Sequence, residues 1–241
     1  MSNVGAFFDI DGTLYRENLQ TELFKKLIRC GIINHSEWYS SLEEYYTKWD
    51  NRLGEYEDYL KHMSEIYCKS IKGLSLNVLR FIAKQVIEEK GGRVYTYTKN
   101  QILWHKKQSH KIITISGSPI ELVEQISKKY EFDIYRGTVY TTEDENYTGE
   151  LEPLWDTTHK QIALNEIVET YKLDLGKCYA YGDTNGDLSM FTKVGHPTCI
   201  NPTKELLNNI KSNPDLKQKM NIIIERKDVI YKINLDSIDF I

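Results

Sequence analysis

The chain has 241 residues, of which 40% are hydrophobic and 27% are charged, with a formal net charge of −4 at pH 7. This length allows one large domain or a core domain with a smaller inserted one. The acidic balance argues against a nucleic-acid-binding surface, which needs a basic face. No apolar run approaches the ~20 residues of a membrane-spanning helix, and the four scattered cysteines form no Cys-x-x-Cys pair. We therefore expect a cytoplasmic protein with reduced thiols and no nucleic-acid or membrane partner.

The first predicted element is a strand over residues 4–9, and two carboxylates lie at its end. Asp9 and Asp11 are two positions apart, so in a strand their side chains share one face. This is the strand's carboxyl end, where open α/β sheets bind ligands. Carboxylates this close raise each other's pKa, which suits Mg²⁺-dependent phosphoryl transfer through an aspartyl-phosphate. The alternative is that Asp11 and Gly12 form an ordinary turn.

The stretch from about 17 to 90 differs in composition from the rest of the chain. It is rich in Glu, Lys, Tyr and Leu, it has no proline, and its apolar residues recur at helical spacing, as in Leu74, Val78 and Leu79. This pattern predicts an insert of about four helices that follows the first strand.

A second candidate site follows the insert. A helix is predicted over 93–108, and a strand over 112–115 then leads to Ser116 and Gly117. The next helix is expected from Pro119 to Tyr130, with a capping box formed by Ser118, Pro119 and Glu121. Ser116 and the Gly117 backbone would then lie at a helix N-terminus, which favours an anion. The alternative is a strand–turn–helix without a ligand.

Lys160 is the third candidate. Residues 138–150 predict a β-hairpin, and a helix is expected over 157–171 with an apolar face that includes Ile162, Ala163, Ile167, Val168 and Tyr171. Lys160 would lie in the first turn of this helix, where a cation opposes the helix dipole. Local structure therefore gives no reason for a lysine at this position. The alternative is a solvated surface group, as most lysines are.

The fourth candidate is a pair of aspartates after a strand predicted over 178–182. Asp183 follows this strand, and Asp187 comes four residues later. Carboxylates at a neighbouring strand end are the oxygen ligands that Mg²⁺ prefers, with Asp187 either orienting a bound water or pairing with Lys160. A calcium loop is excluded, because no Glu stands at the required later position. The remaining predicted elements are a short helix, a strand over 194–200, a helix over 203–211 and a hairpin over 221–235.

Strands that alternate with helices predict a doubly wound parallel sheet. The four segments also resemble the haloacid dehalogenase superfamily of phosphohydrolases, and among these the phosphoserine phosphatase-like members, in order and spacing. The resemblance implies an α/β fold with a Rossmann-like core, residues 1–16 and 91–241, and a helical C1-type cap, residues 17–90.

The resemblance also implies roles for the candidate residues. Asp9 is the expected nucleophile and Asp11 the general acid and base, while Ser116, Gly117 and Lys160 bind the phosphoryl group. The expected Mg²⁺ site comprises Asp9, Asp11, Asp183 and Asp187, with Asp11 contributing its backbone carbonyl. We expect hydrolysis of a small phosphomonoester through an aspartyl-phosphate. The alternatives are a phosphotransferase of the same chemistry and a non-catalytic protein that binds a phosphorylated ligand.

Two features depart from the family pattern. Gly186 stands where the family usually has Asn or Ser before the last aspartate, and Asn185 is displaced by one position. The phosphoserine enzymes place an Arg before a Lys-Gly-Leu sequence, but residues 62–71, ahead of Lys72-Gly73-Leu74, contain none. A free substrate carboxylate would favour a bidentate Arg, so this absence argues against phosphoserine as the substrate.

Overall fold

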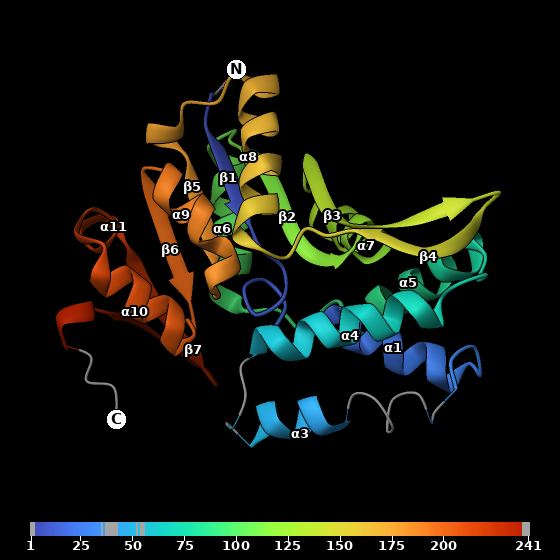
Figure 1. Ribbon diagram of the computed structural model, residues 1–241. Coiled ribbons are helices and arrows are strands. Elements are labelled where there is room, and N and C mark those ends of the chain that lie inside the picture. Colours follow the sequence, from blue (N-terminus) through green and yellow to red (C-terminus); the bar gives the residue numbers. More distant parts are fainter. Residues whose placement is uncertain (1–2, 35, 37–42, 52, 54–55, 238–241) are drawn as a thin grey trace.

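An eight-stranded sheet forms the centre of the computed structural model, which describes residues 3–34, 36, 43–51, 53 and 56–237 (Figure 1). The strand order is β4-β3-β2-β1-β5-β6-β7-β8, with antiparallel pairs only at the two edges, β3 with β4 and β7 with β8. The chain leaves β1 for β2 on one side and later returns to β5 on the other side. Ligands bind at such a switch point. The strands are β1 Gly5–Phe8, β2 Lys111–Pro119, β3 Ile134–Glu143, β4 Asn146–Glu152, β5 Tyr179–Gly182, β6 His196–Ile200, β7 Asn221–Arg226 and β8 Val229–Ile233.

Helices cover both faces of the sheet, as the predicted doubly wound fold requires. Successive residues of β1 point to opposite faces, so Ala6 and Phe8 belong to one buried cluster and Phe7 to the other. The first cluster includes residues of α6 (Thr96–Lys107) and α7 (Ile120–Tyr130). The second includes residues of α8 (Thr157–Tyr171), α9 (Leu188–Lys193), α10 (Lys204–Ser212) and α11 (Pro214–Lys219). The α/β fold class is therefore confirmed.

The segment between β1 and α6 is helical, as predicted. Its described helices are α1 (Leu19–Arg29), α3 (Glu43–Asp50), α4 (Tyr56–Ser70) and α5 (Leu76–Lys90). Buried residues of α1 and α5, such as Leu23 and Ile82, join the same cluster as Phe8 of the sheet. Because one hydrophobic cluster crosses the division between the two parts, the domain boundaries at 17 and 90 stay predictions.

Ion pairs join the two connections of this insert to the core. Arg16 donates to Glu225 Oε1 at 3.1 Å, and Arg93 pairs with Glu17. Glu225 is a buried residue of β7, and its carboxylate also accepts the backbone N–H groups of Thr96 and Tyr97, at 2.9 and 2.8 Å. One carboxylate therefore binds both the segment that enters the insert and the first turn of the helix that follows it.

Two local predictions are wrong. Helix α7 begins at Ile120 with Pro119 as its N-cap and without a side-chain capping bond. The predicted capping box does not form, because Ser118 Oγ donates to Asp11 and Glu121 Oε1 accepts from the Tyr147 hydroxyl.

The second concerns α8, whose apolar face is narrower than predicted. Ala163, Leu164 and Ile167 are buried, but Ile162 and Tyr171 are 53% and 39% exposed. These two residues therefore lie outside the face that packs on the sheet.

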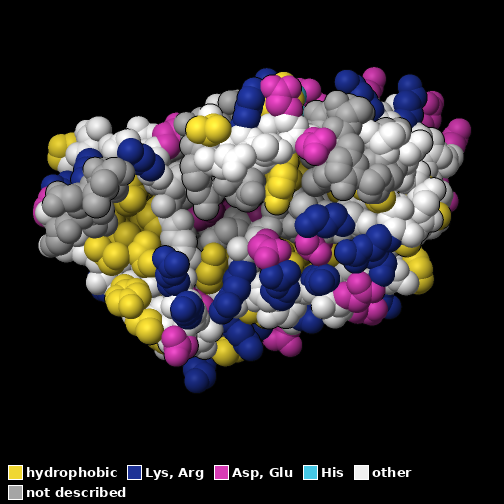
Figure 2. Space-filling view, turned by 90° about the horizontal axis from the view of Figure 1, so that it is seen from below, with side chains coloured by type: hydrophobic (Ala, Val, Ile, Leu, Met, Phe, Trp, Pro, Cys, Tyr) yellow, Lys and Arg dark blue, Asp and Glu magenta, His cyan; other side chains and the backbone are white. Residues whose placement is uncertain are grey.

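The hairpins predicted over 138–150 and 221–235 are present as β3–β4 and β7–β8. None of the helices in the described ranges combines the length and apolarity needed to cross a membrane. Seen from the side of the insert, Lys and Arg side chains lie among Asp and Glu side chains over the middle of the surface (Figure 2).

Candidate active site

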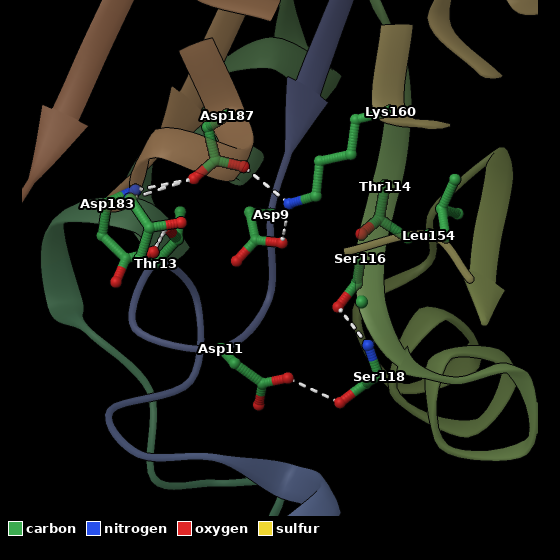
Figure 3. A network of polar contacts seen from close by, with 12 residues as sticks. Asp9, Asp11, Thr13, Thr114, Ser116, Ser118, Leu154, Lys160, Asp183 and Asp187 are labelled. Atoms are coloured by element: carbon green, nitrogen blue, oxygen red, sulfur yellow. Dashed lines mark hydrogen bonds and ion pairs between the residues drawn. The ribbon is translucent and has the colours of Figure 1, made fainter. Parts of the chain in front are cut away.

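A buried lysine lies between two aspartates at the carboxyl end of β1 (Figure 3). Asp9 lies two residues after Phe7 and so points to the same face of the sheet, the face that α8 covers. Its N–H donates to the carbonyl of Tyr181 in β5 at 2.9 Å. Asp156 caps the N-terminus of α8, and Lys160 in its first turn points toward β1. The Lys160 ammonium donates to Asp9 Oδ1 at 2.7 Å and to Asp187 Oδ1 at 2.6 Å. These contacts explain a buried lysine at a helix start.

The loop after β5 holds Asp183 and Asp187 in place by backbone and side-chain bonds. Asp187 Oδ2 accepts the N–H groups of Asp183 and Thr184 at 3.0 and 3.2 Å. Thr13, from the loop after β1, donates its hydroxyl to Asp183 Oδ1 at 3.0 Å. Two segments 170 residues apart in sequence therefore form one site at adjacent strand ends.

These carboxylates form a group that could hold a cation. Asp9, Asp183 and Asp187 are all buried and offer oxygens within 4.8 Å of one another. Burial raises the pKa of Asp9 to about 7, against the opposing effect of Lys160. Burial, with Asp187 and Asp9 nearby, holds the pKa of Asp183 well above its usual range.

One lysine among three buried carboxylates leaves excess negative charge, and the donors are all oxygens, so the residues fit a hard cation such as Mg²⁺. Asp187 is already bound through both oxygens, to Lys160 and to the N–H groups of Asp183 and Thr184. Asp9 and Asp183 are therefore the better direct ligands.

Asp11 lines the same cavity as Asp9 but its side chain takes a different direction (Figure 3). Ser118 Oγ donates to Asp11 Oδ2 at 2.5 Å, and the Leu19 N–H donates to Oδ1 at 2.6 Å. Burial raises the pKa of Asp11 to about 6, although both hydrogen bonds lower it. Because β1 ends at Phe8, the strand pleat expected to place both carboxylates on one face does not reach Asp11. The loop contacts set its direction instead.

Two glycines are required by the carboxylates that they touch. Gly12 has φ +78°, and a Cβ there would lie 2.1 Å from Asp183 Oδ2. A Cβ at Gly182 would lie 2.4 Å from the Cγ of Asp187. Gly12 therefore leaves room for Asp183, and Gly182 leaves room for Asp187.

Ser116 and Gly117 lie in β2, which continues to Pro119 and so runs further than predicted. Ser116 is buried, and its Oγ accepts the Ser118 N–H at 3.2 Å. The candidate catalytic cavity, of about 50 Å³, is lined by Asp9 and Asp11, by Lys160 and by residues from the insert. Its other lining residues are Asn18, Gln20, Ser64, Gly117, Ser118, Trp155 and Thr184. Asn18 also lines a neighbouring cavity of about 490 Å³ between insert and core, together with Tyr46 and Tyr59.

The family model of haloacid dehalogenase-like hydrolases matches residues 6–192, which include all four candidate motifs. The chain belongs to this family. A probable phosphatase from Mycobacterium tuberculosis is 25% identical over 207 residues, 85% of this chain and 71% of that protein. A histidinol-phosphatase from Neisseria meningitidis is 24% identical over 213 residues, 86% of this chain and 94% of that protein.

Solved structures share the fold at lower identity. A protein of unknown function from Bordetella pertussis superimposes with a TM-score of 0.72 at 17% identity, over 88% of this chain and 96% of that one. A phospho-aspartyl intermediate analogue of a phosphoserine phosphatase superimposes with a TM-score of 0.59 at 20% identity, over 95% of this chain and 96% of that one. The chain is therefore similar in fold to phosphoserine phosphatases of the haloacid dehalogenase-like family.

The departure at Gly186 from the usual haloacid dehalogenase-like pattern has a local cause. A Cβ at Gly186 would lie 2.5 Å from the carbonyl oxygen of Trp155, and one at Gly117 would lie 2.8 Å from the Trp155 Cβ. Both glycines therefore make room for the segment that carries Trp155, which lines the catalytic cavity. Asn185 is held by its own bonds, to Asn209 and Thr157. Neither Trp155 nor Ser118 was identified from sequence as a site residue, because their neighbours are distant in the chain.

Proposed function

We propose that the protein is a Mg²⁺-dependent phosphatase that hydrolyses a small phosphomonoester through an aspartyl-phosphate on Asp9. One observation carries the proposal: Asp9 is bound by Lys160 through one oxygen, while its other oxygen points toward the space between Asp183 and Asp11 (Figure 3). A nucleophile, a fixed cation and a second carboxyl group with a pKa of about 6 thus meet at one cavity. The family and the phosphatase names of the relatives support the same activity.

In the first step, an oxygen of Asp9 attacks phosphorus, and the bond from phosphorus to the leaving oxygen breaks. Asp11 donates its proton to that oxygen, so the alcohol leaves neutral. In the second step, the Asp11 carboxylate takes a proton from water, whose oxygen attacks phosphorus and releases Asp9. Ser116, the Gly117 N–H and Lys160 stabilise the phosphoryl oxygens.

A bound Mg²⁺, with Asp9, the Asp11 carbonyl and Asp183 as ligands and Asp187 held beside them, would offset the repulsion between an anionic nucleophile and an anionic ester. We propose residues 17–90 as the cap that closes the site, because Gln20 and Ser64 of this segment line the catalytic cavity. The four free cysteines, three of them buried, support a reducing, cytoplasmic setting.

The substrate we propose is a small phosphomonoester without a recognition carboxylate. The described residues that line the catalytic cavity include Lys160 as their one cation and no Arg. The three described residues on its insert side, Asn18, Gln20 and Ser64, are neutral amides and a hydroxyl. Such groups suit a hydroxylated leaving group better than an amino acid.

The test is phosphate release from a panel of phosphomonoesters, with Mg²⁺ and with EDTA. The panel contains phosphoserine, phosphocholine, sugar phosphates and nucleotides, and the proteins are the wild type, Asp9→Asn and the control Asp215→Asn, whose side chain is exposed on α11. We expect release that requires Mg²⁺, survives in the control and falls by about 10⁴-fold or more in Asp9→Asn, as when a covalent nucleophile is removed.

Near-normal turnover by Asp9→Asn would exclude the covalent mechanism. Phosphate transfer to added alcohols or sugars at the expense of release would identify a phosphotransferase. Binding of phosphomonoesters without turnover would identify a non-catalytic ligand-binding protein.

A further inference from the structure

Ser118 contacts two candidate site residues, Ser116 and Asp11, that lie far apart in the sequence. It lies near the end of β2, where the register with β3 shifts between Ile115 and Pro119. Its side chain is buried, with 2% of its surface exposed. The N–H of Ser118 donates to Ser116 Oγ at 3.2 Å, and its hydroxyl donates to Asp11 Oδ2 at 2.5 Å (Figure 3). One residue therefore touches both the expected phosphate-binding serine and the expected acid.

The second oxygen of Asp11 is bound from the opposite side. The N–H of Leu19, the first residue of α1, donates to Asp11 Oδ1 at 2.6 Å. A carboxyl group bound at both oxygens, by a core strand and by an insert helix, has both of its side-chain torsions fixed. Ser118 contributes the contact on the core side and stands 107 residues away from Asp11 in sequence.

Within the described part of the chain, the Ser118 hydroxyl donates to Asp11 alone. It does not cap α7, whose N-cap is Pro119 without a side-chain bond. A serine here thus replaces water at a buried carboxyl group with a donor of fixed position, and preorganised contacts of this kind keep a catalytic group in its productive geometry.

We propose that Ser118 is a positioning residue that aims the carboxyl group of Asp11 at the leaving-group oxygen. This rests on the proposed function, in which Asp11 transfers the proton. The bond that breaks runs from phosphorus to the leaving oxygen, and the proton moves from Asp11 to that oxygen. An alkoxide needs this proton to leave, whereas a nitrophenoxide leaves readily as an anion. Loss of the Ser118 hydroxyl therefore affects the two leaving groups unequally.

The experiment compares the rate of the first step for benzyl phosphate and for p-nitrophenyl phosphate, two esters of similar size, with Mg²⁺ present. This rate is measured as the pre-steady-state release of benzyl alcohol or p-nitrophenolate, because Asp11 is also the proposed base of the second step and kcat would combine both roles. The proteins are the wild type, Ser118→Ala, Ser118→Thr and Asp11→Asn. Ser127→Ala is the matched control, because it removes a buried hydroxyl that has no partner among the described residues and lies outside the site. Thermal unfolding of each variant shows that the fold is kept.

We expect Ser118→Ala to lower the first-step rate for benzyl phosphate roughly 10- to 100-fold, the range for a hydrogen bond to a charged group. For p-nitrophenyl phosphate we expect a loss of less than about threefold. Ser118→Thr, which keeps a hydroxyl, restores most of the benzyl phosphate activity, and Ser127→Ala changes neither substrate. Equal losses on both esters in Ser118→Ala, or no loss, would overturn the proposal.

The Asp11→Asn variant separates this proposal from the function on which it rests. If Asp11→Asn loses benzyl phosphate activity selectively while Ser118→Ala does not, Asp11 is the acid and only the role of Ser118 is wrong. If Asp11→Asn slows the first step equally for both substrates, the assignment of Asp11 as the acid fails, and the role of Ser118 fails with it.

Discussion

The two faces of the sheet each bury a polar cluster, and the clusters are built in opposite ways. On the α8 face, Asp9, Asp183 and Asp187 surround one lysine. On the α6 face, the buried ring of His105 lies 2.9 Å from the Tyr181 hydroxyl and 2.8 Å from Nδ1 of His110. The first cluster, the carboxylate cluster, has three acidic groups for one basic group. The second, the histidine cluster, is satisfied by neutral hydrogen bonds.

In the proposed function, this difference separates a site that binds a ligand from a cluster that contributes to stability. Burial lowers the pKa of His105 from 6.5 to about 3, so the ring is neutral in the folded protein at pH 7. Burial raises the pKa of Asp9 from 3.8 to about 7, so ionised Asp9 is disfavoured by its surroundings. A fold keeps a buried group in its unfavourable charge state where function needs that state.

The largest effect is expected from removing the one cation of the carboxylate cluster. Lys160→Met removes the cation that pairs with Asp9 and Asp187, which we expect to lower the free energy of unfolding by about 3–5 kcal/mol. The measurement is urea unfolding with and without Mg²⁺, and added Mg²⁺ is expected to restore part of the loss. Lys128→Met is the control, because Lys128 forms an exposed pair with Glu124 and its loss should cost less than about 0.5 kcal/mol. Equal stability of the two variants would show that the charges of this cluster are not unbalanced.

The next largest effect is expected from a substitution at Gly12, which lies against Asp183. Gly12→Ala introduces a Cβ at φ +78° and against Asp183 Oδ2, so we expect a loss of about 2–4 kcal/mol and weaker Mg²⁺ protection in thermal unfolding. Gly31→Ala isolates the backbone contribution, because Gly31 has φ +70° with nothing within 4 Å of its Cβ position. We expect Gly31→Ala to cost about 1–2 kcal/mol. A Gly12→Ala variant no worse than Gly31→Ala would mean that Asp183 moves aside without consequence.

The histidine cluster is tested by acid. Unfolded His105 binds a proton below pH 6.5, but the folded protein does not bind one there until about pH 3. Its contribution to stability is therefore complete above pH 6.5 and is lost as the pH falls toward 3, by up to about 1.4 kcal/mol per pH unit. His105→Gln should flatten this slope in urea unfolding between pH 7 and 4. An unchanged slope in His105→Gln would place the acid sensitivity elsewhere.

The carboxylate cluster has the opposite pH dependence. Folded Asp9 holds a proton up to about pH 7, whereas unfolded Asp9 releases it near 3.8, so this residue's contribution to stability falls as the pH rises through that window. In metal-free buffer at pH 8, Asp9→Asn should therefore be more stable than the wild type, by on the order of 1 kcal/mol or more. This gain should vanish at pH 4, where both proteins carry a neutral group. A variant that is less stable at pH 8 would show that the ion pair with Lys160 outweighs burial.

The fold could be predicted from the sequence, whereas the burial of Lys160 in the candidate site could not. The alternation of strands and helices predicts the doubly wound sheet, because the two-residue repeat of a strand and the 3.6-residue repeat of a helix can both be read from neighbouring residues. Both hairpins follow from turn residues between apolar runs. Lys160 was identified by its spacing alone, yet its two partners, Asp9 and Asp187, lie 151 and 27 residues away. Its burial could not be derived from the helix that carries it.

The incorrect predictions have the same physical origin. Ser118 fits a local capping rule, but its hydroxyl donates to Asp11, brought close by the β1–β2 pairing, and accepts no N–H from the first turn of α7. Ile162 fits the helical period of α8 but lies beside the buried face rather than on it. Local patterns rank the contacts within one element, whereas competition from distant elements decides which of them form.

Through the carboxylate of Glu225, the hairpin β7–β8 contacts the two connections of the insert, which lie far from it in the sequence. The family match ends at residue 192, so Glu225 of β7 lies beyond it. Yet this one side chain binds Arg16 before the insert and the amides of Thr96 and Tyr97 after it. A chain shortened to residues 6–192 would retain every proposed catalytic residue and the Arg93–Glu17 pair between the two connections of the insert, but it would lose the contacts of Glu225 with both. The last strands of the sheet thus help to fix both ends of a helical segment that lies far earlier in the chain.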